Sequence, residues 1–256
     1  MSAAAGSGRR VAVITGASSG IGAATARALG AAGYELVLGA RRLDRLGEVA
    51  GPLGAHALPL DVTDRASVEA FAAAIPRVDV LVANAGKALG TDRIETAREE
   101  LWDTMFRTNV LGVLRTVQAL LPKLVASGDG LLVIVGSIAG FETYRGGAGY
   151  TASKHALRAV TRTLRLELLG KPVRLTELSP GLVETEFSLV RFEGDGPRAR
   201  KVYEGMKPLT ADDVAECVRW VCSLPAHVDV DEIVVRPRDQ ATATEVHRRL
   251  PEGEKP

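Results

Sequence analysis

The stretch that decides the fold is VAVITGASSGIG, residues 11–22. Five mostly β-branched residues lead into a turn with Gly16, Gly20 and Gly22, and a helical pattern begins at about Ile21. Glycine allows the strand to turn sharply and a phosphate to approach the backbone. The free N–H groups of a helix N-terminus attract a pyrophosphate. We therefore expect a dinucleotide site here, bound by Gly16, Ser18, Ser19, Gly20, Ile21 and Gly22.

Outward from this turn, short apolar runs alternate with amphipathic stretches. The apolar runs are expected to be strands, at residues 11–15, 35–40, 56–61, 78–84, 130–137, 173–180 and 231–237. Two long stretches carry helical stripes: Val110, Leu114, Val117 and Leu121 within 98–121, and Leu157, Val160, Leu164 and Leu168 within 150–169. This alternation predicts an α/β fold, a single Rossmann-type, doubly wound domain of about seven parallel strands with helices on both faces.

Three segments differ from that pattern. Residues 1–8 are small and are expected to be flexible, the domain covers residues 9–240, and the polar tail 241–256 is expected to be loosely ordered. Within the domain, residues 188–208 are rich in charge, Gly and Pro. We expect them to form an insertion or substrate lid near the carboxyl ends of the strands, where such folds bind ligands.

Composition narrows the classes of function. The net charge of +1 argues against a nucleic-acid surface, and the lack of an apolar run of about 18 residues argues against a membrane span. The run VAVIT follows Arg9 and Arg10 but leads into a glycine turn, so it is a strand rather than a secretion signal. We expect a cytoplasmic protein with a small-molecule substrate. Cys217 and Cys222 are expected to be buried thiols, and the four histidines have no metal-ligand spacing.

The end of the second expected strand indicates which dinucleotide binds. An NAD site usually places Asp or Glu about twenty residues after the glycine turn, where it binds the ribose 2′-hydroxyl. Here the segment reads LGARRLDR, and Arg41 and Arg42 occupy that place. Arginine binds a 2′-phosphate through charge-assisted hydrogen bonds, so the sequence favours NADP(H) as the cofactor.

A tyrosine and a lysine stand four residues apart in GYTASKHAL, residues 149–157. Tyr150 and Lys154 would share one face of the expected helix. A free phenol has a pKa of about 10, which is too high for a base at neutral pH. A lysine charge about 4 Å away in a sheltered cleft is worth about three pKa units, and would bring the phenol to about 7. The tyrosine would then exchange a proton with a substrate.

Together, these motifs resemble the short-chain dehydrogenase/reductase family. The resemblance rests on TGASSGIG (15–22), Asp61, ANAG (83–86), Asn109, Ser137, Tyr150-x-x-x-Lys154 and SPG (179–181) followed by Thr185, which occur in the family's order over most of the chain. Ala83 is a departure, because the family often has Asn there, which helps to pin the sheet. We expect no loss of chemistry from this difference.

The resemblance implies a catalytic tetrad of Asn109, Ser137, Tyr150 and Lys154. Ser137 would hydrogen-bond the substrate oxygen, Asn109 would relay through water to Lys154, and Lys154 would also hold the nicotinamide ribose. The remaining cofactor contacts implied are Asp61 and Val62 at the adenine, Asn84, Ala85 and Gly86 at its ribose, and Pro180, Gly181, Val183 and Thr185 around the nicotinamide.

Three further stretches narrow the resemblance to NADP-dependent 3-hydroxy acid dehydrogenases of the serine 3-dehydrogenase or malonic semialdehyde reductase type: TEFSLVRFEGD (185–195), PLTADDVAE (208–216) and LPAHVDVDEIVVRPRDQ (224–240). This implies interconversion of β-hydroxy acids and β-oxo acids by a homo-oligomer, a tetramer or a dimer, with the long helices packed between subunits. Two alternatives stay open. One is a 3-oxoacyl carrier-protein or secondary-metabolite ketoreductase of the same family, and the other is a catalytically silent NADP-binding protein.

A β-hydroxy acid needs a cation beyond Ser137 and Tyr150 to bind its carboxylate. Arg145 lies between these two residues in the sequence, and Arg191 lies in the expected lid. A lid residue can close over the ligand and exclude water, which strengthens an ion pair. Arg191 is therefore slightly favoured over Arg145 as the substrate-binding cation.

Overall fold

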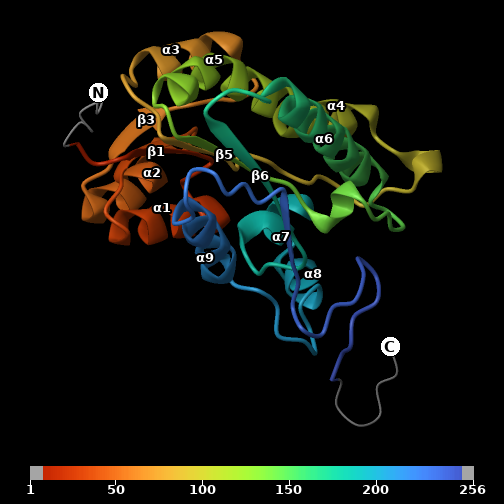
Figure 1. The fold of residues 1–256 in the computed structure, drawn as a ribbon. Coiled ribbons are helices and arrows are strands. Elements are labelled where there is room, and N and C mark those ends of the chain that lie inside the picture. Colours follow the sequence, from red (N-terminus) through yellow and green to blue (C-terminus); the bar gives the residue numbers. More distant parts are fainter. Residues whose placement is uncertain (1–7, 250–256) are drawn as a thin grey trace.

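The computed structural model describes residues 8–249 of the chain, drawn as a ribbon in Figure 1. These residues form one seven-stranded sheet in the order β3-β2-β1-β4-β5-β6-β7, and every neighbouring pair is parallel. The predicted doubly wound parallel sheet is thus confirmed. The strands are β1 (Val11–Thr15), β2 (Glu35–Ala40), β3 (His56–Pro59), β4 (Val80–Ala83), β5 (Gly130–Val135), β6 (Val173–Pro180) and β7 (Glu232–Val235).

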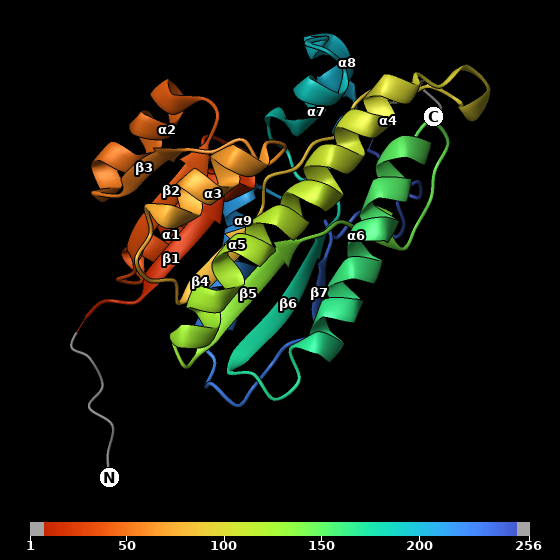
Figure 2. The ribbon, with the colours of Figure 1, turned by 90° about the horizontal axis from the view of Figure 1, so that it is seen from above.

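Helices cover both faces of this sheet, as Figures 1 and 2 show. One face packs against α1 (Gly20–Ala31), α2 (Leu43–Ala50) and α9 (Ala211–Cys222), and the other against α3 (Arg65–Ala73), α5 (Gly112–Ala126) and α6 (Ala148–Glu167). Successive strand residues point to opposite faces. In β1, Ala12 and Ile14 therefore belong to the first core and Val13 to the second.

The long helix expected over residues 98–121 is interrupted. It consists of α4 (Glu99–Phe106), a π-helical turn (Arg107–Leu111) and α5. The expected stripe is also partly wrong, since α5 buries Val113, Leu120 and Leu124 while Leu114 is 37% exposed. The reason is that α5 is apolar on two faces, so spacing alone could not tell which face meets the sheet. π turns occur frequently at functional sites.

Four strands, β3, β4, β5 and β7, are shorter than expected, and a buried carboxylate accounts for the late start of β4. β4 begins at Val80 rather than at residue 78. The Asp79 carboxylate accepts a hydrogen bond from the Val11 backbone N–H at 2.7 Å and pairs with Arg77. A side chain thus takes the place of a ladder bond at this end of the sheet. β3 stops at Pro59, which cannot donate a ladder hydrogen bond.

The expected lid and tail lie against each other. Residues 188–208 include most of α7 (Glu186–Arg191) and all of α8 (Gly196–Lys201). Residues 241–249 pack on them, since the Arg249 N–H donates to Gly205 and the Arg248 guanidinium donates to Val202. The flexible segment expected at residues 1–8 lies outside the described residues except for Gly8, as do residues 250–256 of the tail.

Two further observations concern the part of the chain that the structure describes. None of its helices has both the length and the apolar character needed to cross a membrane. Both cysteines are free thiols: Cys222 is buried, as expected, whereas Cys217 is only partly buried.

Candidate active site

A cavity of about 740 Å³ lies at the carboxyl ends of the central strands. Its place matches the crevice between β1 and β4, where the strand order reverses and such sheets bind ligands. Most of the predicted site residues line it: Gly16, Ser18, Ser19, Gly20, Ile21, Arg41, Arg42, Asp61, Val62, Asn84, Ala85, Gly86, Ser137, Tyr150, Lys154, Pro180, Gly181, Val183, Thr185 and Arg191. Gly22, Asn109 and Arg145 are not among its lining residues.

The glycine turn has the geometry that its sequence requires. Gly16 and Gly20 adopt positive φ angles of 67° and 53°, which only glycine adopts readily. Gly22 serves packing instead, because a Cβ there would lie 2.4 Å from the Gly16 carbonyl oxygen. Ser19 precedes α1 without a side-chain cap, so the first N–H groups of the helix remain available to an anion.

Asn84 and Thr15 join the two strands that border the crevice. The Asn84 side chain donates to the Thr15 carbonyl at 2.9 Å, and the Thr15 hydroxyl accepts from the backbone N–H groups of Asn84 and Ala85, each at 3.0 Å. Asn84 thereby pins the sheet, although Ala83 stands where the family often has Asn.

The two arginines after β2 differ in their contacts. Arg42 donates to the Ser19 hydroxyl at 2.7 Å, to the Ser18 hydroxyl at 3.2 Å, and to the Glu186 carboxylate of α7 at 2.9 Å. Arg45 pairs with the same carboxylate. Arg41 makes no side-chain hydrogen bond or ion pair with any residue between 8 and 249, and it lines the cavity as an exposed cation. The exposed guanidinium of Arg41 is therefore free to take a phosphate.

Ser137, Tyr150 and Lys154 come together where β5 ends and α6 begins. The Ser137 hydroxyl oxygen accepts from the Ala139 N–H at 3.1 Å, and its own proton can be donated to Tyr150 or to a substrate. The Tyr150 ring makes an edge contact with Phe187 of α7, with ring centroids 5.6 Å apart. The Lys154 ammonium lies 6.0 Å from the centre of the Tyr150 ring and donates to the Val135 carbonyl at 2.9 Å.

The expected effect of Lys154 on Tyr150 is not found. Burial raises the pKa of Tyr150 above its ordinary value, and the nearby Tyr144 acts in the same direction. Hydrogen bonding to Ser137 and the charge of Arg191 lower this pKa, but they do not outweigh burial. Lys154 is itself buried, which lowers its pKa to about 8. The prediction counted the charge of Lys154 but omitted the free-energy cost of burying a charged phenolate, which raises the pKa of Tyr150.

Asn109 lies in the π turn and is 1% exposed. Its side-chain oxygen accepts from the Lys87 N–H at 2.8 Å, and its nitrogen donates to the Lys87 carbonyl at 2.8 Å and to the Ser153 hydroxyl at 3.0 Å. Ser153 in turn donates to the Tyr150 carbonyl. These contacts use the side-chain amide to join the loop after β4 to α6, and none of them reaches Lys154.

The two candidate substrate arginines are separated by the structure. Arg145 is exposed and lies away from the cavity wall. Arg191 lines the cavity, and it donates to the Tyr144 hydroxyl at 3.0 Å and to the Gly90 carbonyl at 3.4 Å. Its guanidinium also lies 5.2 Å from the centre of the Tyr144 ring. These partners are neutral, so Arg191 keeps its full charge toward the cavity.

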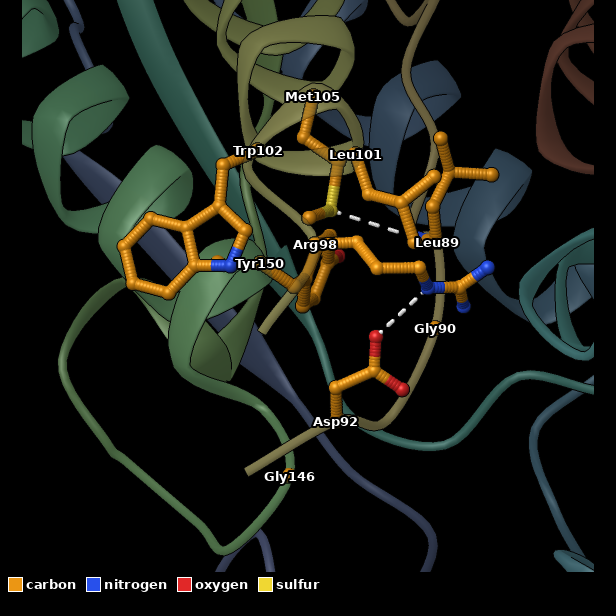
Figure 3. A pocket seen from close by; sticks show the side chains of 10 residues that line it. Leu89, Gly90, Asp92, Arg98, Leu101, Trp102, Met105, Gly146 and Tyr150 are labelled. Carbon is orange, nitrogen blue, oxygen red and sulfur yellow. Dashed lines mark hydrogen bonds and ion pairs between the residues drawn. The ribbon is translucent and has the colours of Figure 1, made fainter. Parts of the chain in front are cut away.

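A second, much smaller pocket of about 10 Å³ lies beside Tyr150 (Figure 3). Its wall contains Met105 and Trp102 of α4, and its mouth carries the ion pair between Arg98 and Asp92, at 2.9 Å. This volume admits about one water molecule, so the pocket serves to pack Tyr150 rather than to bind a substrate.

Sequence reasoning missed several residues of the cavity wall. They are Lys87, Tyr144, Phe187, Tyr203, Gln240 and, in the tail, Ala243, Thr244, Val246 and Arg248. Gln240 offered a weak signal, being a polar residue beside a strand-like run. It is 5% exposed, and its side-chain oxygen accepts from the Leu182 N–H at 2.8 Å. The tail residues carry no motif and reach the cavity only because the chain folds back.

Comparison with known proteins identifies a family, two relatives and a solved structure. The family model described as short chain dehydrogenase matches residues 10–195. An NADP-dependent 3-hydroxy acid dehydrogenase of Salmonella typhi is 40% identical over 246 residues, which are 93% of this chain and 99% of that protein. A sulfoacetaldehyde reductase of Chromohalobacter salexigens is 43% identical over 237 residues, which are 89% of this chain and 94% of that protein. The closed form of a serine dehydrogenase complexed with NADP+ superposes with a TM-score of 0.88 at 39% identity, covering 93% of this chain and all of the other.

Proposed function

The chain belongs to the short-chain dehydrogenase family and is an oxidoreductase, and we propose that it uses NADP(H) to interconvert a β-hydroxy acid and the matching β-oxo acid. One observation carries this proposal. A single cavity holds the glycine turn and the arginines after β2, the trio Ser137, Tyr150 and Lys154, and the unneutralised cation Arg191. The cavity thus joins a dinucleotide site to a proton donor and an anion site.

The residues present fit NADP(H). The uncapped N-terminus of α1 and the positive φ angles of Gly16 and Gly20 suit a pyrophosphate. Arg41 and Arg42 would hold the 2′-phosphate. We propose that the walls formed by Asp61 and Val62, by Asn84 to Gly86, and by Pro180, Gly181, Val183 and Thr185 hold the adenosine and nicotinamide parts. When bound, the cofactor supplies the hydride chemistry.

Side chains of this protein would transfer the proton to the substrate oxygen. Burial raises the pKa of Tyr150, so its phenol is protonated at neutral pH and can donate to the oxygen of a carbonyl substrate. The Ser137 hydroxyl, which acts on Tyr150 in this structure, would donate a second hydrogen bond to that oxygen. Asn109 would act by position, since it fixes the loop after β4 against the helix that carries Tyr150.

Arg191 supports an anionic substrate. It lies on α7 at the cavity wall, and its charge reaches Tyr150. Sulfoacetaldehyde, named for one relative, and 3-hydroxy acids, named for another, both carry an acidic group near the reacting carbon. A guanidinium is suited to a carboxylate or a sulfonate through paired hydrogen bonds. The preferred acid of this chain is therefore expected to be small and negatively charged.

Arg191→Ala should raise the Michaelis constant for a β-hydroxy acid by about ten-fold or more, because a charge-assisted hydrogen bond is worth about 1.5–3 kcal/mol. Turnover of an uncharged alcohol of similar size should barely change. Arg145→Ala is the matched control, since it removes an equal charge from outside the cavity. The measurement is NADPH formation with free acids, the uncharged alcohol and carrier-type thioesters. Equal losses on the acid and the alcohol, or faster turnover of the thioesters, would contradict the proposed substrate class.

Exposed leucines on the long helices support a homo-oligomer. Leu166 of α6 and Leu169, two residues after that helix, are 77% and 90% exposed, and Leu111 of the π turn is 40% exposed. Burying such side chains between subunits removes apolar surface from water. We propose that these helices pack against those of a second copy, in a dimer or a tetramer.

A further inference from the structure

A buried carboxylate lies in β6, the strand that pairs with β5, whose Val135 carbonyl binds the active-site lysine. Glu177 lies in β6 and is 4% exposed. Strand interiors of such sheets are usually apolar, and a buried carboxylate is costly unless a cation balances it. The reaction outlined above gives Glu177 no task.

Glu177 and Lys154 lie against the same peptide of β5. The Lys154 ammonium donates to the Val135 carbonyl at 2.9 Å. A Glu177 carboxylate oxygen lies 2.8 Å from the point that a Cβ on the next residue, Gly136, would occupy. Only glycine leaves this space, and the residue after it is Ser137. The carboxylate therefore supports the short segment that carries both the lysine's acceptor and the catalytic serine.

The neighbouring charges leave Glu177 only partly neutralised. Arg158, one helical turn after Lys154 on α6, lies 3.6 Å from the Glu177 carboxylate. The same guanidinium makes two hydrogen bonds to Glu232 of β7. One arginine thus serves two carboxylates. Lys154 supplies the second positive charge: burial raises the pKa of Glu177, and the charges of Arg158 and Lys154 act against that rise.

Other elements place no competing carboxylate on Lys154. On its own helix the Lys154 ammonium lies near the Tyr150 ring, and from the loop after β4 it approaches Gly86, whose Cβ position would lie 3.9 Å from the ammonium. The π turn contributes the neutral Asn109. Among residues 8–249, Glu177 is the carboxylate whose charge acts on Lys154.

We propose that Glu177 is a positioning residue that keeps the buried Lys154 protonated and seated on the end of β5. The titration behaviour agrees with this geometry. Burial lowers the pKa of Lys154 to about 8, and the Glu177 charge acts against that fall. Without the carboxylate, the pKa of the lysine would fall further, and the ammonium would be lost near neutral pH.

The test measures Lys154 itself, so it does not depend on the proposed function. The chain has seven lysines. With the lysine ε-carbons labelled with ¹³C, the Lys154 signal is assigned by its loss in Lys154→Arg and followed by NMR as pH is raised. Glu177→Gln should lower the pKa of Lys154 by about one unit or more, the usual effect of one buried charge. Glu177→Asp, which keeps the charge, should stay near the wild type.

Glu232→Gln, at a more exposed position, is a second variant for which a smaller change in the pKa of Lys154 is expected. It frees Arg158 to neutralise Glu177 more completely, so the pKa of Lys154 should fall in the same direction by a smaller amount. In turnover assays, the alkaline limb of the pH profile should move to lower pH in the same order. An unchanged pKa of Lys154 in both Glu177→Gln and Glu232→Gln would overturn the proposal, whatever substrate the enzyme takes.

Discussion

The charged groups at the two ends of the cavity, the cofactor end around Arg41 and Arg42 and the catalytic end around Tyr150 and Lys154, differ in their exposure to solvent. At the cofactor end, the side chains of Arg42 and Glu186 are 45% and 40% exposed, and Arg41 faces solvent. At the catalytic end, Lys154 is 6% exposed and Tyr150 9%. Exposed charges are screened and can exchange partners, whereas a buried charge must be balanced where it lies. Mutations at the cofactor end should therefore change the affinity for NADPH moderately, whereas mutations at the catalytic end should change the turnover rate strongly.

Tyr150→Phe should produce the largest effect. It removes one hydroxyl while the ring can still pack on Phe187. Loss of a general acid should reduce kcat by about 10²–10⁴-fold. NADPH affinity, followed by fluorescence, should remain near the wild type. A variant that kept more than a few percent of the wild-type rate would show that another group transfers the proton.

Arg41→Asp should have an intermediate effect, confined to the cofactor end. It replaces an unpaired cation on the cavity wall with a charge that repels the 2′-phosphate. The dissociation constant for NADPH should rise by about ten-fold or more. NADH lacks this phosphate and serves as the internal control. If NADPH binding were unchanged, the phosphate would have to lie on Arg42.

Glu186→Gln should have the smallest effect on NADPH binding, and the direction of that effect tests how the charges at the cofactor end act. The carboxylate pairs with Arg42 and Arg45, and these arginines outweigh burial to hold the pKa of Glu186 below its ordinary value. Such exposed pairs contribute about 0–1 kcal/mol, so the melting temperature should change little.

The same change should tighten NADPH binding by a few-fold at most, because a negative charge leaves the phosphate site. Glu184→Gln, two residues away and without an ion pair to a described residue, is the matched control. Weaker NADPH binding in Glu186→Gln alone would mean that this carboxylate holds Arg42 in its binding position.

The same contrast explains what the sequence could predict. The glycine turn, the Arg41–Arg42 pair and the Tyr150–Lys154 pair are local sequence patterns, and residues of each line the cavity, Gly22 excepted. The sequence did not reveal Glu177, which comes near Lys154 only because β6 pairs with β5. The sequence also did not reveal the neutral contacts of Arg191 or the tail residues at the cavity wall, because these contacts form between segments that are far apart in the sequence. The pKa of Tyr150 was predicted in the wrong direction, since burial cannot be read from spacing.

The most direct test of the account records two properties on the same preparations of wild type, Tyr150→Phe and Arg41→Asp: NADPH affinity, and turnover at saturating NADPH with a small β-oxo acid. We expect each substitution to impair one of the two properties and to leave the other intact. Tyr150→Phe should bind NADPH normally and not turn over, while Arg41→Asp should bind it weakly and turn over at close to the wild-type rate once saturated. Loss of both properties together in both folded variants would contradict a cavity whose two ends work separately.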